Sequence, residues 1–158
     1  MLVRRATPED QEFLAETIAG AFASTRVVSR GRVHEDASAL DGFVVENDGR
    51  PIGLALWHEV DGDAELVVIV TTYRGAGAGG ALLDAVVEHA REAGWKRLWL
   101  ITTNDNTDAI RLYQRTGWEW VGWHKDAVDT SRALKPELPP TGAYGIPIKH
   151  EIEFEYPL

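Results

Sequence analysis

The feature that most constrains this chain is a strand-like run followed by a segment built only of glycine and alanine. Residues 67–71 are mostly β-branched, residues 75–80 read Gly-Ala-Gly-Ala-Gly-Gly, and residues 81–83 open an apolar helix. Small side chains let backbone N–H groups face an anion, and the helix N-terminus adds partial positive charge. The sequence therefore predicts a strand, a phosphate-binding loop and a helix in direct succession.

The residues that follow the glycines exclude one phosphate-binding motif and leave another open. A P-loop requires Lys and then Ser or Thr at the start of the helix, whereas this helix starts with Gly80 and Ala81, and the next lysine is Lys96. The dinucleotide fingerprint G-x-G-x-x-G is matched by Gly75, Gly77 and Gly80. A nicotinamide-binding oxidoreductase therefore stays open at this point.

A third pattern, R-x-x-G-x-G after a strand, is matched by Arg74, Gly77 and Gly79. A second motif, N-x-x-A-x-x-x-Y-x-x-x-G-[FW], follows the next predicted strand and is matched at every position by Asn106, Ala109, Tyr113, Gly117 and Trp118. In this order the two motifs resemble those of the GCN5-related N-acetyltransferase (GNAT) family. An acidic residue suited to a dinucleotide ribose is lacking, since Asp105 belongs to a helix-start cluster and is interpreted as a capping residue.

The resemblance implies an α/β (α+β) fold with a mixed, mostly antiparallel sheet of about seven strands, splayed in the middle and flanked by about four helices. It implies that acetyl-CoA binds in the splay as co-substrate. The activity implied is acetyl transfer directly to a primary amine in a ternary complex. A catalytically silent acyl-CoA-binding module and, less favoured, the oxidoreductase are the alternatives.

The resemblance also assigns residues to the co-substrate. The pantetheine arm is expected beside the strand before the loop, on backbone groups that a β-bulge releases. The pyrophosphate is expected on the glycine loop, and Tyr113 is expected to donate a proton to the departing thiolate, a buried structural tyrosine being the alternative. The expected cofactor-binding residues are Val68, Ile69, Val70, Arg74, Gly75, Ala76, Gly77, Ala78, Gly79, Gly80, Asn106 and Tyr113.

The general base and the acceptor pocket are less well defined by the sequence. Glu65, at the start of the strand before the loop, is the leading candidate for the base, acting through water, with His58, Glu59 and His34 as competitors. The acceptor pocket is expected to include Arg32, His34 and Trp57. The late segment around residues 135–153 also resembles a branch of the family that has no assigned substrate.

Composition narrows the classes of partner and chemistry. The 158 residues suit a single domain, residues 1–158, and the absence of cysteine excludes a covalent acetyl-cysteine intermediate. A net charge of −9 argues against nucleic acid, and the five histidines show no ligand spacing, so no metal is expected. We expect a cytoplasmic protein with no membrane partner and a small-molecule or peptide amine as acceptor. A homodimer through the last strands stays open.

Periodicity and turn signals predict most of the secondary structure. Residues 24–39 are expected to form an irregular or helical link. Residues 126–145 are expected to form a lid, a disordered loop, or a loop that contains a short strand or a helical turn. Strands are predicted at 2–5, 42–46, 52–59, 64–71, 96–103, 118–124 and, by strict alternation, 146–156. Helices are predicted at 8–22 and 81–93, and a further helix that starts in the cluster around Asp105 is predicted to carry Tyr113.

Overall fold

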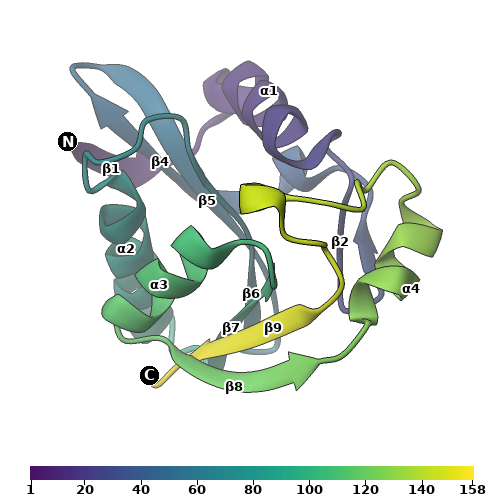
Figure 1. Ribbon diagram of the computed structural model, residues 1–158. Coiled ribbons are helices and arrows are strands. Elements are labelled where there is room, and N and C mark those ends of the chain that lie inside the picture. Colours follow the sequence, from purple (N-terminus) through teal and green to yellow (C-terminus); the bar gives the residue numbers. More distant parts are fainter.

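The computed structural model describes residues 1–158 and contains one seven-stranded sheet flanked by helices on both faces (Figure 1). This confirms the predicted fold class. In spatial order the strands are β1 (Leu2–Arg5), β4 (Asp41–Asn47), β5 (Arg50–Val60), β6 (Asp63–Thr71), β7 (Arg97–Thr103), β9 (Glu151–Tyr156) and β8 (Glu119–His124). The helices are α1 (Gln11–Phe22), α2 (Ala78–Glu92), α3 (Thr107–Arg115) and α4 (Ala127–Leu134), with short 3₁₀ turns at Pro8–Asp10, Ala37–Ala39 and Ala143–Gly145.

The first half of the sheet is an antiparallel meander whose turns follow from Asp-Gly pairs. At the β4–β5 turn Asp48 and Gly49 have φ of 51° and 74°, and at the β5–β6 turn Asp61 and Gly62 have φ of 52° and 84°. Two successive positive φ values define the tight turn that matches the twist of paired strands, and Asp-Gly is a preferred sequence for it. Both predicted hairpins are therefore present.

Two apolar cores hold the helices to the sheet. Leu82, Val86 and Ala90 of α2 pack with Leu100 and Phe154 on one face. On the other face, residues of α1 pack against β4, β5 and β6, the buried members being Leu14, Ile18, Val44, Leu54, Leu56 and Val68. Figure 1 shows α2 and α3 on one side of the molecule and α1, α4 and the short strand β2 (Val27–Ser29) on the other. Any passage through the sheet therefore joins two separately built surfaces.

Such a passage exists because β6 and β7 separate soon after they pair. Their parallel ladder joins only three residues, Asp63–Glu65, with Arg97–Trp99. Directly beyond it the β5–β6 register shifts, since Leu56 faces Val68 while Trp57 faces Leu66, which leaves Val67 as the extra residue of a bulge. A bulge bends its strand and interrupts the ladder. The far edge of β6 is consequently unpaired, which confirms the predicted splay.

Two predictions of local structure differ from the molecule. Residues 24–39 contain the hairpin β2 (Val27–Ser29) and β3 (Arg32–His34), turned at Arg30 and Gly31, whose φ values are 49° and 72°. Strands of three residues are too short to show an alternating pattern, so the prediction of an irregular or helical link was wrong.

The predicted strand at 146–156 forms only from Glu151 onward. The Asn104 side-chain oxygen accepts the N–H groups of Lys149 and His150 at 2.9 Å each, and Pro147 has no N–H to donate. These amides are therefore withheld from a ladder. We call residues 136–150, which connect α4 to β9 and cross the end of the sheet, the strap. In the loop predicted at residues 126–145, the structure contains the helix α4 (Ala127–Leu134), so the alternative with a helical turn is the one observed.

Candidate active site

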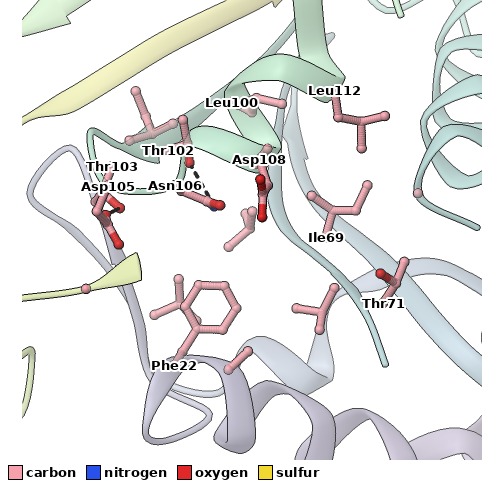
Figure 2. A pocket seen from close by; sticks show the side chains of 18 of the residues that line it. Phe22, Ile69, Thr71, Leu100, Thr102, Thr103, Asp105, Asn106, Asp108 and Leu112 are labelled. Carbon is pink, nitrogen blue, oxygen red and sulfur yellow. Dashed lines mark hydrogen bonds between the residues drawn. The ribbon is translucent and has the colours of Figure 1, made fainter. Parts of the chain in front are cut away.

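A cavity of about 940 Å³ lies where β6 and β7 separate. One end is lined by the glycine loop, the first turn of α2 and the inner face of α3. The other end is lined by the last turn of α1, by β2, by α4 and by the strap. In Figure 2 Phe22 faces Asn106 and Thr102 across this space, with Ile69 of β6 on the wall between them. The cavity thus connects the two faces of the sheet.

The glycine loop presents backbone rather than side chains to this cavity. Gly75 and Gly77 have φ of 84° and 76°, a conformation that residues with a Cβ rarely adopt, and Gly77 is the N-cap of α2. The cap has no side-chain hydrogen bond, and the first intrahelical bond is donated by Ala81 to the Gly77 carbonyl. The N–H groups of residues 78–80 therefore have no helical acceptor, which fits a phosphate group.

Arg74 lies at the mouth of the cavity and is paired with a carboxylate. Its Nη1 is 2.5 Å from Oδ2 of Asp108, and its side chain is 84% exposed. Tyr144 Oη donates to the same carboxylate at 2.8 Å. The pKa of Asp108 is held below its usual value by the Tyr144 hydroxyl and by Arg74, and the pKa of Arg74 is raised mainly by Asp108. An incoming phosphate would have to compete with Asp108 for this guanidinium.

Asn106 and Asp105 occupy the turn between β7 and α3. Asn106 is the N-cap by position, but its side chain makes no capping bond, and its Nδ2 donates to Thr102 Oγ1 at 3.2 Å (Figure 2). Asp105, interpreted from the sequence as a cap, instead accepts from Thr103 Oγ1 at 2.5 Å and from the Ala143 N–H at 3.1 Å. Its carboxylate ties the strap to the end of β7, which is a contact between distant parts of the chain.

Tyr113 projects from α3 into the wall of the cavity. Its ring packs against Phe154 and Trp118 with centroid distances of 5.4 and 6.2 Å, and the residue is 4% exposed. Burial raises the pKa of the phenol well above its usual value, because the phenolate would be poorly solvated there. The hydroxyl is therefore in its protonated, donor form at neutral pH.

Sequence comparison identifies the family of a protein with this cavity. The "Acetyltransferase (GNAT) family" profile matches residues 11–118. The chain belongs to the GNAT acetyltransferase family. The "Uncharacterized protein YdhI" of Bacillus subtilis (strain 168) is 40% identical over 116 residues, which is 73% of this chain and 72% of that protein. Acetyl-CoA is the co-substrate of this acetyltransferase, and the Gly77 cap with its free amides fits the phosphates.

Solved structures share the fold of this GNAT acetyltransferase. The IAA acetyltransferase from Bacillus cereus ATCC 14579 superposes with a TM-score of 0.71 and 21% identity, covering 99% of each chain. A GNAT family acetyltransferase from Elizabethkingia anophelis, crystallised with acetyl-CoA bound, gives a TM-score of 0.69 at 19% identity, covering 99% of this chain and 97% of that one. At these identities the likeness concerns the fold.

The residues expected at the pantetheine arm of this acetyltransferase differ in whether they line the cavity. Ile69 and Val70 line the cavity, whereas the Val68 side chain is buried in the core beneath α1. Ala76, in the glycine loop, does not line the cavity, while Ala78, Gly79 and Gly80 do.

The candidates for base and acceptor pocket lie beside the cavity rather than on its lining. Glu65 is 2% exposed, and its Oε2 is 3.8 Å from Nε2 of His34, with neither atom hydrogen-bonded. Arg32 contacts His58 at the surface, 3.4 Å from its Nδ1. Trp57 packs with Phe43, His89 and Trp95 under α2, on the far side of the sheet from β2. The structure brings His34 and Glu65 together and leaves Trp57 apart.

Sequence reasoning missed the polar residues at the α1–α4 end of the cavity. Lys135 is 1% exposed and its Nζ donates to the carbonyls of Phe22 and Arg26. Glu151 is 3% exposed, and Ser29 and Ser131 are buried with hydroxyls that have no hydrogen-bond partner. Lys135 and Glu151 fall in the late segment that resembles a branch of the family, but nothing in that segment marks them as site residues, and Ser29 and Ser131 belong to no motif. Only tertiary contact therefore reveals them.

No group of three or more His, Cys, Asp or Glu residues is placed to hold a metal ion. No helix of this acetyltransferase has the length and apolar character needed to span a membrane.

Proposed function

We propose that this protein, acting as a single domain over residues 1–158, transfers the acetyl group of acetyl-CoA directly to a primary amine in a ternary complex. The observation that carries the proposal is the cavity that crosses the sheet between β6 and β7. Donor and acceptor would enter it from opposite faces and meet in the gap. The chain has no cysteine to carry an acetyl group, which supports direct transfer.

The donor end is suited to CoA by its backbone. The free amides at the start of α2 would hold the pyrophosphate, joined by Arg74 once it leaves Asp108. The pantetheine arm would lie along the unpaired edge of β6 beside Ile69 and Val70, with Asn106 on the opposite wall. Backbone amides along that edge are the groups a pantetheine chain would pair with.

The transfer requires one bond to form, one to break and two protons to move. The acceptor ammonium first loses a proton, which would pass through water to Glu65, whose Oε2 and the nearby Nε2 of His34 have no hydrogen-bond partner in the protein. The neutral nitrogen then attacks the thioester carbonyl, and a backbone N–H beside the Val67 bulge would stabilise the oxyanion. The C–S bond breaks, Tyr113 would donate its proton to the departing sulfur, and the proton that the new amide nitrogen loses would return to Tyr113.

Calorimetry with acetyl-CoA and, separately, NAD tests the donor site first. We expect micromolar acetyl-CoA binding that is lost in Arg74→Ala and Gly77→Trp, and no NAD binding. Release of free thiol is then followed over small amines, amino acids, polyamines and peptides, with Tyr113→Phe as the catalytic control. Binding of acetyl-CoA without thiol release for any amine would indicate a silent acyl-CoA-binding module, and absence of acetyl-CoA binding would overturn the proposal.

A further inference from the structure

The α1–α4 end of the cavity, which we call the acceptor end, contains three charged residues. It is lined by the last turn of α1, β2, α4, the strap and the first residue of β9, and its charged members are Lys135, Glu151 and, where the strap meets the end of β7, Asp105. All three are buried, at 1%, 3% and 7% exposure. A buried charge needs a partner, so the partners of each residue decide which one is available to a ligand.

The ammonium group of Lys135 is already hydrogen-bonded within the protein. Its ammonium donates to the carbonyls of Phe22 and Arg26, which lie at and just after the C-terminus of α1. These contacts hold α4 against α1 and use two of the three N–H groups. Burial also lowers the pKa of Lys135. It serves as a wall of the pocket rather than as an anion-binding group.

The carboxylate of Glu151 is only weakly paired with a positive charge. Its Oε2 accepts the backbone N–H of Arg30 at 3.2 Å, and its Oε1 is 3.4 Å from Nη1 of the same residue. The Arg30 side chain is 40% exposed at the tip of the β2–β3 turn, where solvent competes for it. Asp105, by contrast, accepts the Thr103 hydroxyl at 2.5 Å with one oxygen and the Ala143 N–H at 3.1 Å with the other, and these contacts tie the strap to β7. Glu151 is therefore the buried carboxylate at the acceptor end with the longer hydrogen bonds, and the one that we expect an incoming cation to contact.

The rest of the acceptor end is apolar, apart from two hydroxyls. Six apolar side chains from α1, β2, α4 and the strap line it, namely Phe22, Val27, Val28, Val128, Leu138 and Ile148. Ser29 and Ser131 also line it, at 6% and 3% exposure, and neither hydroxyl has a partner within the protein. Unpartnered buried hydroxyls are uncommon in folded proteins and mark places where a further hydrogen-bond partner fits.

We propose that Glu151 binds the ammonium group of the acceptor and that the acceptor is a compact primary monoamine with an apolar body. This inference rests on the proposed acetyl transfer. A polyamine with one ammonium on Glu151 would bring its second among apolar side chains such as Phe22, Val28 and Leu138. The other carboxylate there, that of Asp105, is already hydrogen-bonded to Thr103 and Ala143. An α-amino acid would bring its own carboxylate next to Glu151, where like charges repel.

The substrate preference tests this class directly. Thiol release is measured at saturating acetyl-CoA with phenethylamine, phenylalanine and spermidine, because the first two differ only by a carboxylate. We expect a kcat/KM for phenethylamine at least about tenfold above those of the other two, since mismatched buried charge is strongly rejected.

Two substitutions then distinguish binding of the amine by Glu151 from a purely structural role of Glu151 in holding the β2–β3 hairpin. Glu151→Gln is expected to raise the KM for phenethylamine about tenfold or more and to leave the KM for acetyl-CoA unchanged. Arg30→Gln removes the competing guanidinium, so the KM for phenethylamine should fall or stay the same. Glu153→Gln is the matched control, because Glu153 lies on the same face of β9, pairs with Arg97 and His124, and is outside the cavity.

A purely structural ion pair would make Glu151→Gln and Arg30→Gln weaken the enzyme alike, with equal losses of melting temperature, and that result would overturn the inference. So would turnover of spermidine or phenylalanine in preference to phenethylamine, or an unchanged amine KM in Glu151→Gln. These outcomes require an active wild-type enzyme. Absence of thiol release with every amine is a different result, which refutes amine acetylation itself together with this inference.

Discussion

The two ends of the cavity are built in different ways. The donor end consists of two short continuous segments, residues 74–80, which present backbone amides at the start of α2, and residues 106–113, which carry Asn106 and Tyr113. The acceptor end is assembled from α1, β2, α4, the strap and β9, and depends on buried polar side chains such as Lys135 and Glu151. A common co-substrate can be held by backbone groups of one local segment. Selectivity for one acceptor requires particular side chains from several segments to be brought together.

The largest effect is expected at the donor end, from Gly77→Trp. Gly77 has φ of +76° and caps α2, so a side chain there both strains the backbone and covers the free amides. We expect acetyl-CoA affinity to fall about a hundredfold or more by calorimetry. Gly94→Trp is the matched control, since Gly94 has φ of +69°, has open space around it and lies outside the cavity. Equal loss of binding in both variants would mean that general unfolding, not the loop, is responsible.

Next in size is Tyr113→Phe, which tests whether the phenol serves chemistry or packing. Because the ring stays in its contacts with Phe154 and Trp118, the melting temperature should change little. We expect kcat to fall about a hundredfold with the KM for acetyl-CoA unchanged. Tyr156→Phe, in the same aromatic cluster and outside the cavity, should keep its kcat. A fully active Tyr113→Phe enzyme would remove the residue from the mechanism.

Lys135→Met should damage the acceptor end selectively. Two buried carbonyls would lose their donor, so the free energy of unfolding in urea should fall by about 1–3 kcal/mol. The KM for the amine should rise, because α4 is no longer held to α1, while acetyl-CoA affinity is retained. Lys149→Met, at an exposed position of the strap, is the control. Loss of acetyl-CoA binding in Lys135→Met would show that the two ends are not independent.

The smallest effect is expected from Asp108→Asn and should be a gain. The substitution removes the carboxylate that holds Arg74 away from an incoming phosphate, so acetyl-CoA should bind about twofold to fivefold more tightly at low salt. The gain should shrink as ionic strength rises. Asp129→Asn makes the same charge change at an exposed position of α4 and should leave the affinity for acetyl-CoA unaltered. Weaker binding in Asp108→Asn would show that this carboxylate orients Arg74 productively.

Much of the fold and of the donor end could be predicted from the sequence. The strands at 42–46, 52–59 and 64–71, the Asp-Gly turns and the glycine loop all depend on neighbours a few residues apart. Such local rules, of alternation, of positive φ at glycine and of helix termini, are visible in a linear sequence. Family resemblance then added the splay, which the short β6–β7 ladder confirms.

Tertiary structure alone decided the rest. Asn104 withholds two amides from the predicted late strand, Lys135 reaches the end of α1 more than a hundred residues away, and Arg30 meets Glu151 across the cavity wall. None of these pairs has a fixed spacing, and each depends on where the cores place β2, α4 and the strap. The sequence by itself determined a strand, a phosphate loop and a helix, because those follow from local backbone preferences. The chemistry of the acceptor end was decided by folding, because it depends on contacts between segments far apart in the chain.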